Sequence, residues 1–382
     1  MKEKADFKTL CVHAGELKDE QHGGAISPLY MSSSYAFNDV ETNQYPRYFN
    51  TPNQRGLAIK IAALEGAEAG MIFGSGMAAI STALLSHLKS GDHVIFQDDL
   101  YGGTRNFIKH EFPKYRIQYS FTAGLTATDF ENEIQDNTKG IYIETPSNPT
   151  LKIVDLQAIS TLAKKTGLWT MIDNTFASPV NQNPIAFGID VVLHSATKYL
   201  GGHSDICAGA VLGSQKAIDR VFESATNHGG SLSDYTVWLL ERSIKTLFLR
   251  VQAQNQNAQL LAEFLADQDW VDNVYYPGLP QHPDHEIAKK QMKGFGGMLT
   301  FDLAPNLDCK QFLLGLKLIK PTMSLAGIES TALSPRLTSH ALLTETERIA
   351  QGITPQMVRF STGIEAIQDL KEDLIQSVNQ QH

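Results

Sequence analysis

The chain contains the stretch Val191-Val192-Leu193-His194-Ser195-Ala196-Thr197-Lys198-Tyr199-Leu200-Gly201-Gly202-His203-Ser204-Asp205, which decides the fold prediction. An apolar, β-branched run, typical of a buried strand, leads into two hydroxyl side chains, a lysine and a glycine-rich turn. A lysine directly after a parallel strand lies at the carboxyl edge of the sheet, where such sheets bind their ligands. Taken alone, Lys198 could also be an exposed lysine at a strand end. The hydroxyls of Ser195 and Thr197 can bind an anion beside it and so favour a ligand site.

A second apolar run ends in an acidic residue. It reads Leu168-Trp169-Thr170-Met171-Ile172-Asp173-Asn174-Thr175, and one α/β crossover with a loop fits between Asp173 and Lys198. An aspartate in such a place can simply cap a helix or lie in a loop. At the carboxyl edge of a sheet, beside Lys198, it can instead face a cofactor ring and charge it.

A glycine turn follows the predicted strand Met71-Ile72-Phe73. This turn, Gly74-Ser75-Gly76-Met77-Ala78-Ala79, opens a predicted helix and presents backbone N–H groups at the positive end of its dipole, which suits a phosphate. The same residues can form a plain tight turn, and their spacing does not fit the dinucleotide-binding pattern. A phosphate loop, a lysine that forms an imine and an aspartate that faces the ring together match the needs of pyridoxal phosphate.

Two further residues are candidates for the same site. Tyr101 follows a predicted strand and precedes glycines, so its ring can stack on a flat cofactor and its hydroxyl can carry a proton. It could also be a surface tyrosine in a turn. Arg359 lies in the late strand candidate Met357–Ser361 and can hold a substrate carboxylate through two parallel hydrogen bonds. The commoner role of an arginine is a surface ion pair.

The pattern of apolar runs predicts an α/β fold. Short buried runs alternate with helical segments, such as the one from Asn53 to its stop at Gly66, and this alternation indicates a mainly parallel sheet covered on both faces. Residues 1–47 lack helical periodicity and predict an extended arm that packs on another subunit. We expect a large cofactor-binding domain over residues 48–249 and a smaller α/β domain over residues 250–382.

Charge and cysteine content bear on partners and compartment. The formal net charge of −9 argues against nonspecific nucleic-acid binding, which needs basic patches. Cys11, Cys207 and Cys309 lie far apart and form no CxxC pattern, so we expect free thiols in a reducing cytoplasm.

Several other functions are disfavoured by what the sequence lacks. The charged N-terminus has no hydrophobic leader, and no run reaches the roughly 18 apolar residues that a membrane helix needs. We therefore expect no membrane partner. His203, His282 and His285 have no metal-binding spacing, so no metal site is predicted.

Several segments together resemble the Cys/Met-metabolism enzymes that use pyridoxal phosphate, a group with cystathionine γ-synthase, cystathionine γ- and β-lyases and methionine γ-lyase. The resemblance covers nearly the whole chain. The matching segments are Ala63–Glu68, Ser75–Ile80, Leu100–Thr104, Glu144–Thr150, Asp173–Thr175, Ser195–Tyr199, Gly202–Asp205, Ser324–Ser330 and Val358–Ser361.

The resemblance implies the fold of type I pyridoxal-phosphate-dependent transferases. This fold has a mainly parallel, seven-stranded sheet in the large domain, and its members form homotetramers built from active dimers. Residue by residue, Lys198 would hold the cofactor as an imine and act in catalysis, and Asp173 would pair with the ring nitrogen. Further implied contacts are Gly76, Met77, Ser195 and Thr197 for the phosphate, Tyr45 and Arg47 for the phosphate of the neighbouring subunit, Tyr101 for stacking and proton transfer, Asn148 for the ring oxygen or substrate, and Ser324 and Arg359 for the substrate carboxylate.

Three positions depart from the family pattern. After Arg47 the family usually has an aromatic residue followed by Gly-Asn-Pro-Thr, whereas this chain has Tyr48-Phe49-Asn50-Thr51-Pro52-Asn53. The γ-enzymes that handle cystathionine often carry a glutamate before the serine at 324, and this chain has Met323. Gly103 stands where methionine γ-lyases have cysteine, which disfavours a methionine-degrading activity.

The resemblance implies an enzyme that acts on a small sulfur-containing amino acid. We expect a pyridoxal-phosphate-dependent carbon–sulfur lyase that cleaves cystathionine, at the γ position in preference to the β position. The main alternative is a cystathionine γ-synthase that joins an O-acylhomoserine to cysteine, and methionine γ-lyase is a weaker one. A protein of another class, a scaffold that binds the cofactor without catalysis, is disfavoured because Lys198, Asp173, Tyr101 and Arg359 are all present.

Overall fold

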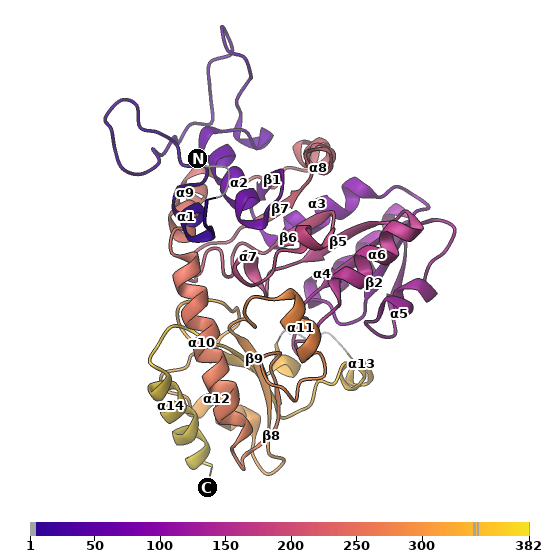
Figure 1. The fold of residues 1–382 in the computed structure, drawn as a ribbon, viewed down its shortest axis with the longest axis vertical. Coiled ribbons are helices and arrows are strands. Elements are labelled where there is room, and N and C mark those ends of the chain that lie inside the picture. The colour runs from indigo at the N-terminus through magenta and orange to yellow at the C-terminus, as the bar shows by residue number, and fades with distance from the viewer. Residues whose placement is uncertain (1–4, 339–340, 342–343, 382) are drawn as a thin grey trace.

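The strands of the chain divide between two sheets, as shown in the computed structural model, which describes residues 5–338, 341 and 344–381 (Figure 1). Within these residues the larger sheet has seven strands in the order β1-β7-β6-β5-β4-β2-β3. Only β7 runs antiparallel to its neighbours, so the predicted mainly parallel, seven-stranded sheet is confirmed. The strands are β1 (Ala69–Phe73), β2 (His93–Gln97), β3 (Gln118–Thr122), β4 (Thr138–Glu144), β5 (Trp169–Asp173), β6 (Val191–His194) and β7 (Gly209–Gly213).

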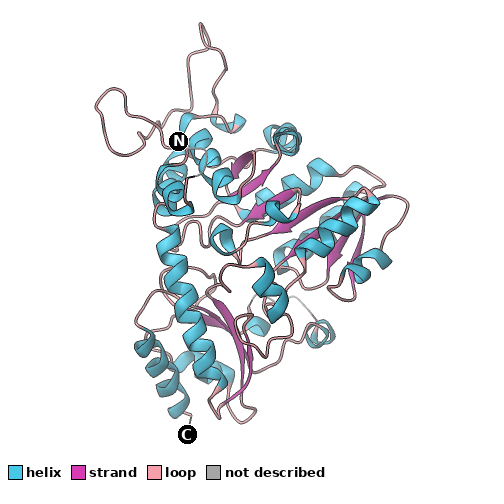
Figure 2. Cartoon of the chain, in the orientation of Figure 1, coloured by secondary structure: helices cyan, strands magenta, loops and turns pink. Residues whose placement is uncertain are grey.

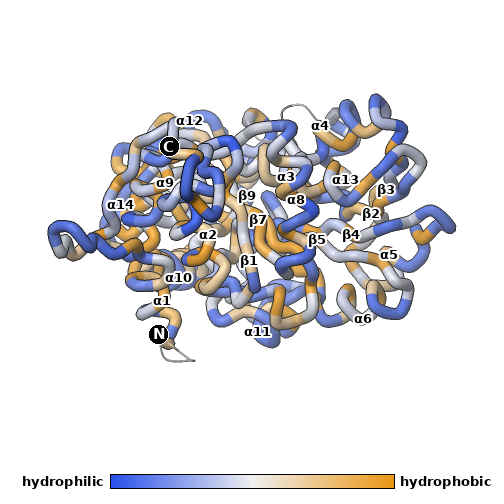
Figure 3. Tube along the Cα trace, turned by 90° about the horizontal axis from the view of Figure 1, so that it is seen from above, coloured by the Kyte–Doolittle hydropathy of each residue, from blue (hydrophilic) through white to orange (hydrophobic). Residues whose placement is uncertain are grey.

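Both faces of this sheet are apolar, because successive strand residues point to opposite sides. Ile143 and Ile172 belong to one buried core, and their neighbours Tyr142 and Met171 belong to the core on the other face. Figure 3 shows the apolar segments gathered in the interior around β5 and β7. The sheet is therefore a middle layer that must be covered by helices on both sides.

Helices from the same part of the chain provide this cover. Leu57 of α2 and Ile159 of α6 pack into the first core, and Ile80 of α3 and Val221 of α8 pack into the second. The helices are α2 (Pro52–Glu65), α3 (Gly76–His87), α4 (Gly102–Glu111), α5 (Ala127–Asn132), α6 (Leu156–Thr166), α7 (Ser178–Asn181), α8 (Gln215–His228) and α9 (Asp234–Ile244), with short 3-10 turns at Pro46–Tyr48, Phe112–Tyr115 and Pro184–Phe187.

Helix α2 begins and ends where its sequence predicts. Thr51 and Gln54 form a reciprocal capping box at its start, and Gly66 ends it with a left-handed φ of 70°. The predicted helix from Asn53 to Gly66 is thereby confirmed.

The second sheet is smaller and antiparallel, in the order β10-β11-β9-β8. Its apolar face, with Phe301 and Phe360, packs against Leu261 of α10 and Leu374 of α14. The elements are β8 (Val271–Tyr275), β9 (Met298–Leu303), β10 (Thr331–Leu333), β11 (Met357–Ser361), α10 (Leu247–Ala266), α11 (His285–Gln291), α12 (Cys309–Gly315), α13 (Glu345–Ala350), α14 (Ile367–Asn379) and a 3-10 turn at Pro335–Leu337.

Helix α10 connects the two sheets (Figures 1 and 2). Its first part buries Leu247 and Val251 in a core of the large sheet, and its last part buries Leu261 and Leu265 in the core of the small sheet. The expected division at residues 249 and 250 falls inside this helix and stays a prediction.

The N-terminal arm is not wholly extended, because it contains helix α1 (Phe7–His13). The side chain of Asp6 caps this helix by accepting the N–H of Lys8 at 2.9 Å, and Cys11 is buried in the core beside α2. A helix of this length depends on such packing and leaves little periodicity in the sequence. The rest of the arm projects from the top of the molecule in Figure 1, and its contact with another subunit stays a prediction.

Among the described residues, no helix is both long enough and apolar enough to cross a bilayer.

The carboxyl ends of β5 and β6 are joined by one buried carboxylate from α2. Glu65 accepts hydrogen bonds from His194 Nε2 at 2.6 Å and from Asn174 Nδ2 at 2.9 Å, and its side chain is fully buried. Removing this acceptor would leave two buried polar groups without it.

We expect Glu65→Ala to lower the free energy of unfolding by about 2–4 kcal/mol, because buried polar groups lose a charged acceptor. Thermal unfolding of the purified protein measures the change. Glu263→Ala, on the exposed side of α10, is the matched control and should change stability by about 0.5 kcal/mol or less. Equal melting temperatures for the two variants would contradict the structural role of Glu65.

Candidate active site

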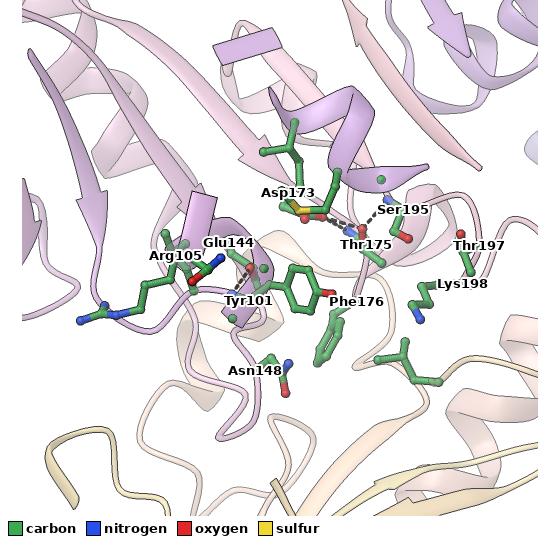
Figure 4. Close-up of a pocket in the computed structure, with 18 of the residues that line it drawn as sticks. Tyr101, Arg105, Glu144, Asn148, Asp173, Thr175, Phe176, Ser195, Thr197 and Lys198 are labelled. Atoms are coloured by element: carbon green, nitrogen blue, oxygen red, sulfur yellow. Dashed lines mark hydrogen bonds between the residues drawn. The ribbon is translucent and has the colours of Figure 1, made fainter. Parts of the chain in front are cut away.

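A cavity lies at the carboxyl ends of β4, β5 and β6, and loops of the small sheet close its other side (Figure 4). Its volume is about 660 Å³, which is the size of a ligand site. The cavity brings together ten of the residues predicted from the sequence. They are Gly76, Met77, Tyr101, Asn148, Asp173, Ser195, Thr197, Lys198, Ser324 and Arg359.

Lys198 follows β6 and lies on the wall of this cavity. Its ammonium donates a hydrogen bond to Ser324 Oγ at 2.9 Å. Burial, together with the positive charge of Arg359, lowers the pKa of Lys198 to about 8. At pH 7 the amine is then neutral in about a tenth of the molecules, far more than for an ordinary lysine, and the neutral form is the one that acts as a nucleophile or a base.

Ser324, the partner of Lys198, has an unusual backbone. Its φ of 94° lies in a region that residues with a side chain rarely adopt. Strained residues of this kind cluster at functional sites, where the surrounding structure holds them in place.

Asp173 is held at the end of β5 by a short chain of hydrogen bonds (Figure 4). The hydroxyl and the N–H of Thr175 donate to Asp173 Oδ1 at 2.5 and 3.0 Å, and Thr175 Oγ1 accepts the N–H of Ser195 at 2.8 Å. Burial raises the pKa of Asp173, and the bonds from Thr175 oppose this shift. These hydrogen bonds link the carboxylate at the end of β5 to the loop that carries Lys198 after β6.

The turn between β1 and α3 forms one end of the cavity. Ser75 caps α3, with its hydroxyl accepting the N–H of Ala78 at 3.0 Å. A Cβ on Gly76 would lie 2.8 Å from the Cβ of Ser195, so only glycine fits at this close approach. Free N–H groups at a helix N-terminus, beside the hydroxyl residues Ser195 and Thr197, suit a phosphate.

Thr197 also holds its own loop in place. Its hydroxyl accepts the N–H of Ala208 at 3.0 Å and lies 3.2 Å from the carbonyl oxygen of the same residue.

Tyr101 immediately precedes α4 and turns its ring into the cavity, where the side chain is partly exposed (Figure 4). The N–H of Tyr101 donates to Glu144 Oε2 at 2.9 Å. Burial, reinforced by the charge of Asp173, raises the pKa of Glu144 well above its ordinary value. Glu144 therefore fixes the backbone from which the Tyr101 ring extends.

Arg359 reaches the cavity from β11 of the small sheet. It is buried, and it donates to Asn148 Oδ1 at 3.1 Å and to the carbonyl of Ser324 at 3.2 Å. Burial lowers the pKa of Arg359 to about 10, so the guanidinium stays charged at neutral pH. A buried cation with planar donors fits a carboxylate.

Tyr45 and Arg47 do not line this cavity. Tyr45 precedes the 3-10 turn Pro46–Tyr48, and Arg47 lies within it. The Arg47 guanidinium lies 5.0 Å from the ring centre of Tyr48 and donates to the carbonyl of Thr226 on α8. Their predicted contact with the phosphate of a neighbouring subunit stays a prediction.

Other residues of the cavity have no role in the sequence prediction. Thr175 and Glu144 are the clearest, and each was open to inference: Glu144 ends the apolar run Ile141–Ile143 just as Asp173 ends its own. Less predictable members of the wall are Phe176, Arg105, Lys109, Cys207 and Glu347. Among the described residues, no group of three His, Cys, Asp or Glu side chains is placed to hold a metal ion.

The polar groups of the cavity fit pyridoxal phosphate. Gly76 leaves the phosphate end open, Asp173 is a buried carboxylate for the ring nitrogen, and Lys198 is an amine of lowered pKa. These are the groups that bind this cofactor and tune its electronics.

Comparisons with known proteins agree with this chemistry. The family model of the Cys/Met metabolism PLP-dependent enzymes matches residues 8–379. A cystathionine gamma-lyase of Bacillus subtilis is 42% identical over 97% of this chain and 98% of its own length. A cystathionine beta-lyase of Lactococcus lactis is also 42% identical, over 96% of this chain and 97% of its own.

A solved structure leads to the same family. Cystathionine gamma-lyase from Lactobacillus plantarum, in complex with L-serine, superposes with a TM-score of 0.95 at 38% identity, over 98% of this chain and 99% of that one. The chain therefore belongs to the Cys/Met metabolism PLP-dependent enzyme family, which confirms the family and the pyridoxal phosphate cofactor predicted from the sequence.

Proposed function

We propose that this protein, a pyridoxal-phosphate-dependent carbon–sulfur lyase, cleaves cystathionine, and that it acts at the γ position in preference to the β position. The observation that carries the proposal is the sharing of Ser324 by two cations. Lys198 bonds its hydroxyl and Arg359 bonds its carbonyl, so the amine lies next to the guanidinium that would hold a substrate carboxylate. Full-length relatives named cystathionine gamma-lyase and cystathionine beta-lyase support the choice of substrate.

The same geometry supports roles for the cofactor-binding residues. Gly76, Met77, Ser195 and Thr197 would bind the phosphate, and Asp173 would keep the ring nitrogen protonated. When bound, the cofactor supplies a sink for the electrons left on the substrate as its α-proton departs. Tyr45 and Arg47 would reach this phosphate from a neighbouring subunit.

The chain's own groups would position the substrate and move its protons. Arg359, Asn148 and the strained Ser324 would hold the α-carboxylate, so that the α-proton faces Lys198. Lys198 would take that proton as a general base, helped by its lowered pKa. Cleavage at the γ carbon also requires a base to remove a β-proton before the sulfur departs, and Lys198 would serve again once it has released the first proton. Tyr101, partly exposed at the mouth of the site, would give a proton to the departing sulfur.

A substrate panel with product masses tests the proposal. With the cofactor-loaded enzyme, we expect cystathionine to give 2-oxobutanoate, cysteine and ammonia from cleavage at the γ carbon. Pyruvate and homocysteine as the main products would mean β cleavage instead. Cystathionine formed from an O-acylhomoserine and cysteine, with no cleavage of cystathionine itself, would establish the synthase. Faster turnover of methionine would favour the methionine-degrading alternative.

Lys198→Ala is the control for the panel. We expect it to lower turnover about a thousandfold, the usual contribution of a general base, with an unchanged fold by circular dichroism.

The amine of Lys198 should become reactive at an unusually low pH. Since its pKa is lowered from 10.5 to about 8, the neutral form should increase through pH 8 and level off above it. The rate of modification of Lys198 in the cofactor-free protein by a small amine reagent, read by peptide mass, measures this. The unfolded chain is the matched control and should keep gaining rate up to about pH 10. If modification of Lys198 in the folded protein also kept gaining rate up to about pH 10, the lowered pKa assigned to Lys198 would be contradicted.

We further propose that the chain forms a homotetramer of active dimers, with the arm as a contact. Ile26, Met31 and Phe37 of the arm expose 57%, 72% and 76% of their surface, which is unusual for large apolar side chains unless a partner covers them. Light scattering should give a mass of four chains of 42.1 kDa each. A monomer mass at micromolar concentration would contradict the proposal.

The three free cysteines support a further proposal, that the protein acts in the reducing cytoplasm. Fractionation that recovers the protein outside the cytoplasm would overturn it.

A further inference from the structure

The outer end of the active cavity is lined by charged side chains that the proposed chemistry does not use. Helix α4 contributes Arg105 and Lys109, and α13 contributes Glu347. Lys109 Nζ lies 2.9 Å from Glu347 Oε1, although the two residues are 238 positions apart in the chain. This ion pair joins α4 to α13.

Glu347 is the carboxylate at this end of the cavity, and its partner there is the Lys109 ammonium. The other acids among its described lining residues, Glu144 and Asp173, are buried at strand ends with partners of their own. Met323, beside the substrate-facing Ser324, is 67% exposed on the cavity wall and offers no charge. An ammonium group that arrives here can therefore be neutralised by Glu347.

Lys109 is the corresponding cation. Arg105 is engaged with Asp98 at 2.7 Å, and its guanidinium stacks 4.3 Å from the ring centre of Phe121. The side chain of Lys109 is 37% exposed, and the carboxylate it contacts, Glu347, lines the same end of the cavity. A carboxylate at this end of the cavity would meet the Lys109 ammonium first.

The spacing along α4 suits a long substrate. Lys109 follows Tyr101 by eight residues, or about 12 Å of helix, and helical side chains lean back toward the N-terminus. The Lys109 ammonium is thus displaced from the reacting centre by a distance of the order of an extended amino-acid thioether.

We propose that Lys109 and Glu347 form a subsite for the distal amino-acid group of the substrate. The Lys109 ammonium binds its carboxylate and the Glu347 carboxylate binds its ammonium. The inference rests on the proposed function, because it requires a thioether that carries an amino-acid group at each end.

The Lys109–Glu347 ion pair can open to let each side chain bind the opposite charge of a ligand. Glu347 Oε2 accepts the N–H and the hydroxyl of Thr344 at 2.9 and 3.0 Å, so Oε1 is left for Lys109 and for a ligand. These bonds, with that of Lys109, hold the pKa of Glu347 at about 2, and its charge persists at any working pH. The two side chains are 37% and 32% exposed, and an ion pair this open to solvent contributes little to stability, so its replacement by the charges of a ligand costs little.

Glu347 also caps α13, and the test must separate this role from binding. Glutamine serves as well as glutamate in a capping box, so Glu347→Gln keeps the cap and removes the charge. Lys109→Met keeps the apolar stem of lysine. Glu111→Gln and Lys114→Met are the matched controls, because this pair at 2.7 Å involves the last residue of α4 and does not line the cavity.

The experiment combines these variants with cystathionine and two analogues, one without the distal amino group and one without the distal carboxylate. We expect Glu347→Gln to lower kcat/KM about tenfold for cystathionine and for the analogue that keeps the amino group, and to leave the analogue without it unchanged. Lys109→Met should show the mirror pattern with the carboxylate. The two control variants should behave as the wild type.

Equal losses on all three compounds, or no loss on any, would overturn the subsite. If the wild type cleaves neither cystathionine nor the analogues, the proposed function fails, and the same comparison is made by calorimetric Kd values. A tenfold weaker Kd confined to the matching variant and ligand still supports the subsite, and equal Kd values overturn it.

Discussion

The carboxylate of Asp173 depends on Thr175, and this contact organises the catalytic edge of the sheet. Burial would favour the neutral acid, whereas two hydrogen bonds from Thr175 favour the charged form. The Thr175 hydroxyl also accepts the N–H of Ser195, so the Asp173 carboxylate at the end of β5 and the loop after β6 cannot shift independently. The position of Lys198 relative to Asp173 is therefore set by local hydrogen bonds as well as by the parallel sheet.

The second half of the site comes from the small sheet. Arg359 lies on β11, and its guanidinium holds both Asn148, which follows β4, and the backbone of Ser324. Ser324 also accepts a hydrogen bond from Lys198. One residue in a strained conformation therefore connects the Lys198 amine, which follows a strand of the large sheet, to the Arg359 guanidinium of the small sheet. Strain of this kind persists only where several contacts act on the same residue.

The sequence predicts the cofactor-binding part of the site better than the outer end of the cavity with Lys109 and Glu347. Lys198 and Asp173 could be placed together because parallel strands all end at one edge of their sheet. Thr175 and Glu144 take part through hydrogen bonds with backbone groups, which leave no pattern of residue types beyond an acid or hydroxyl after a strand. Lys109 and Glu347 could not be paired from the sequence, because they are 238 residues apart and only the folded structure brings them together. Helix α1 was missed for a related reason: packing against α2, more than its own periodicity, holds it.

Helix α10 has a mechanical consequence for the enzyme. Its two ends are buried in different cores, one belonging to the large sheet and one to the small sheet. Arg250 also donates to the carbonyls of Tyr199 and Leu200, next to the reactive lysine. Moving the two sheets apart would therefore require bending or breaking a continuous helix. Helix α10 thus holds the two sheets in a fixed relative position. We therefore expect substrate binding and product release to proceed without a hinge motion of the two sheets, through rearrangement of the side chains that line the cavity.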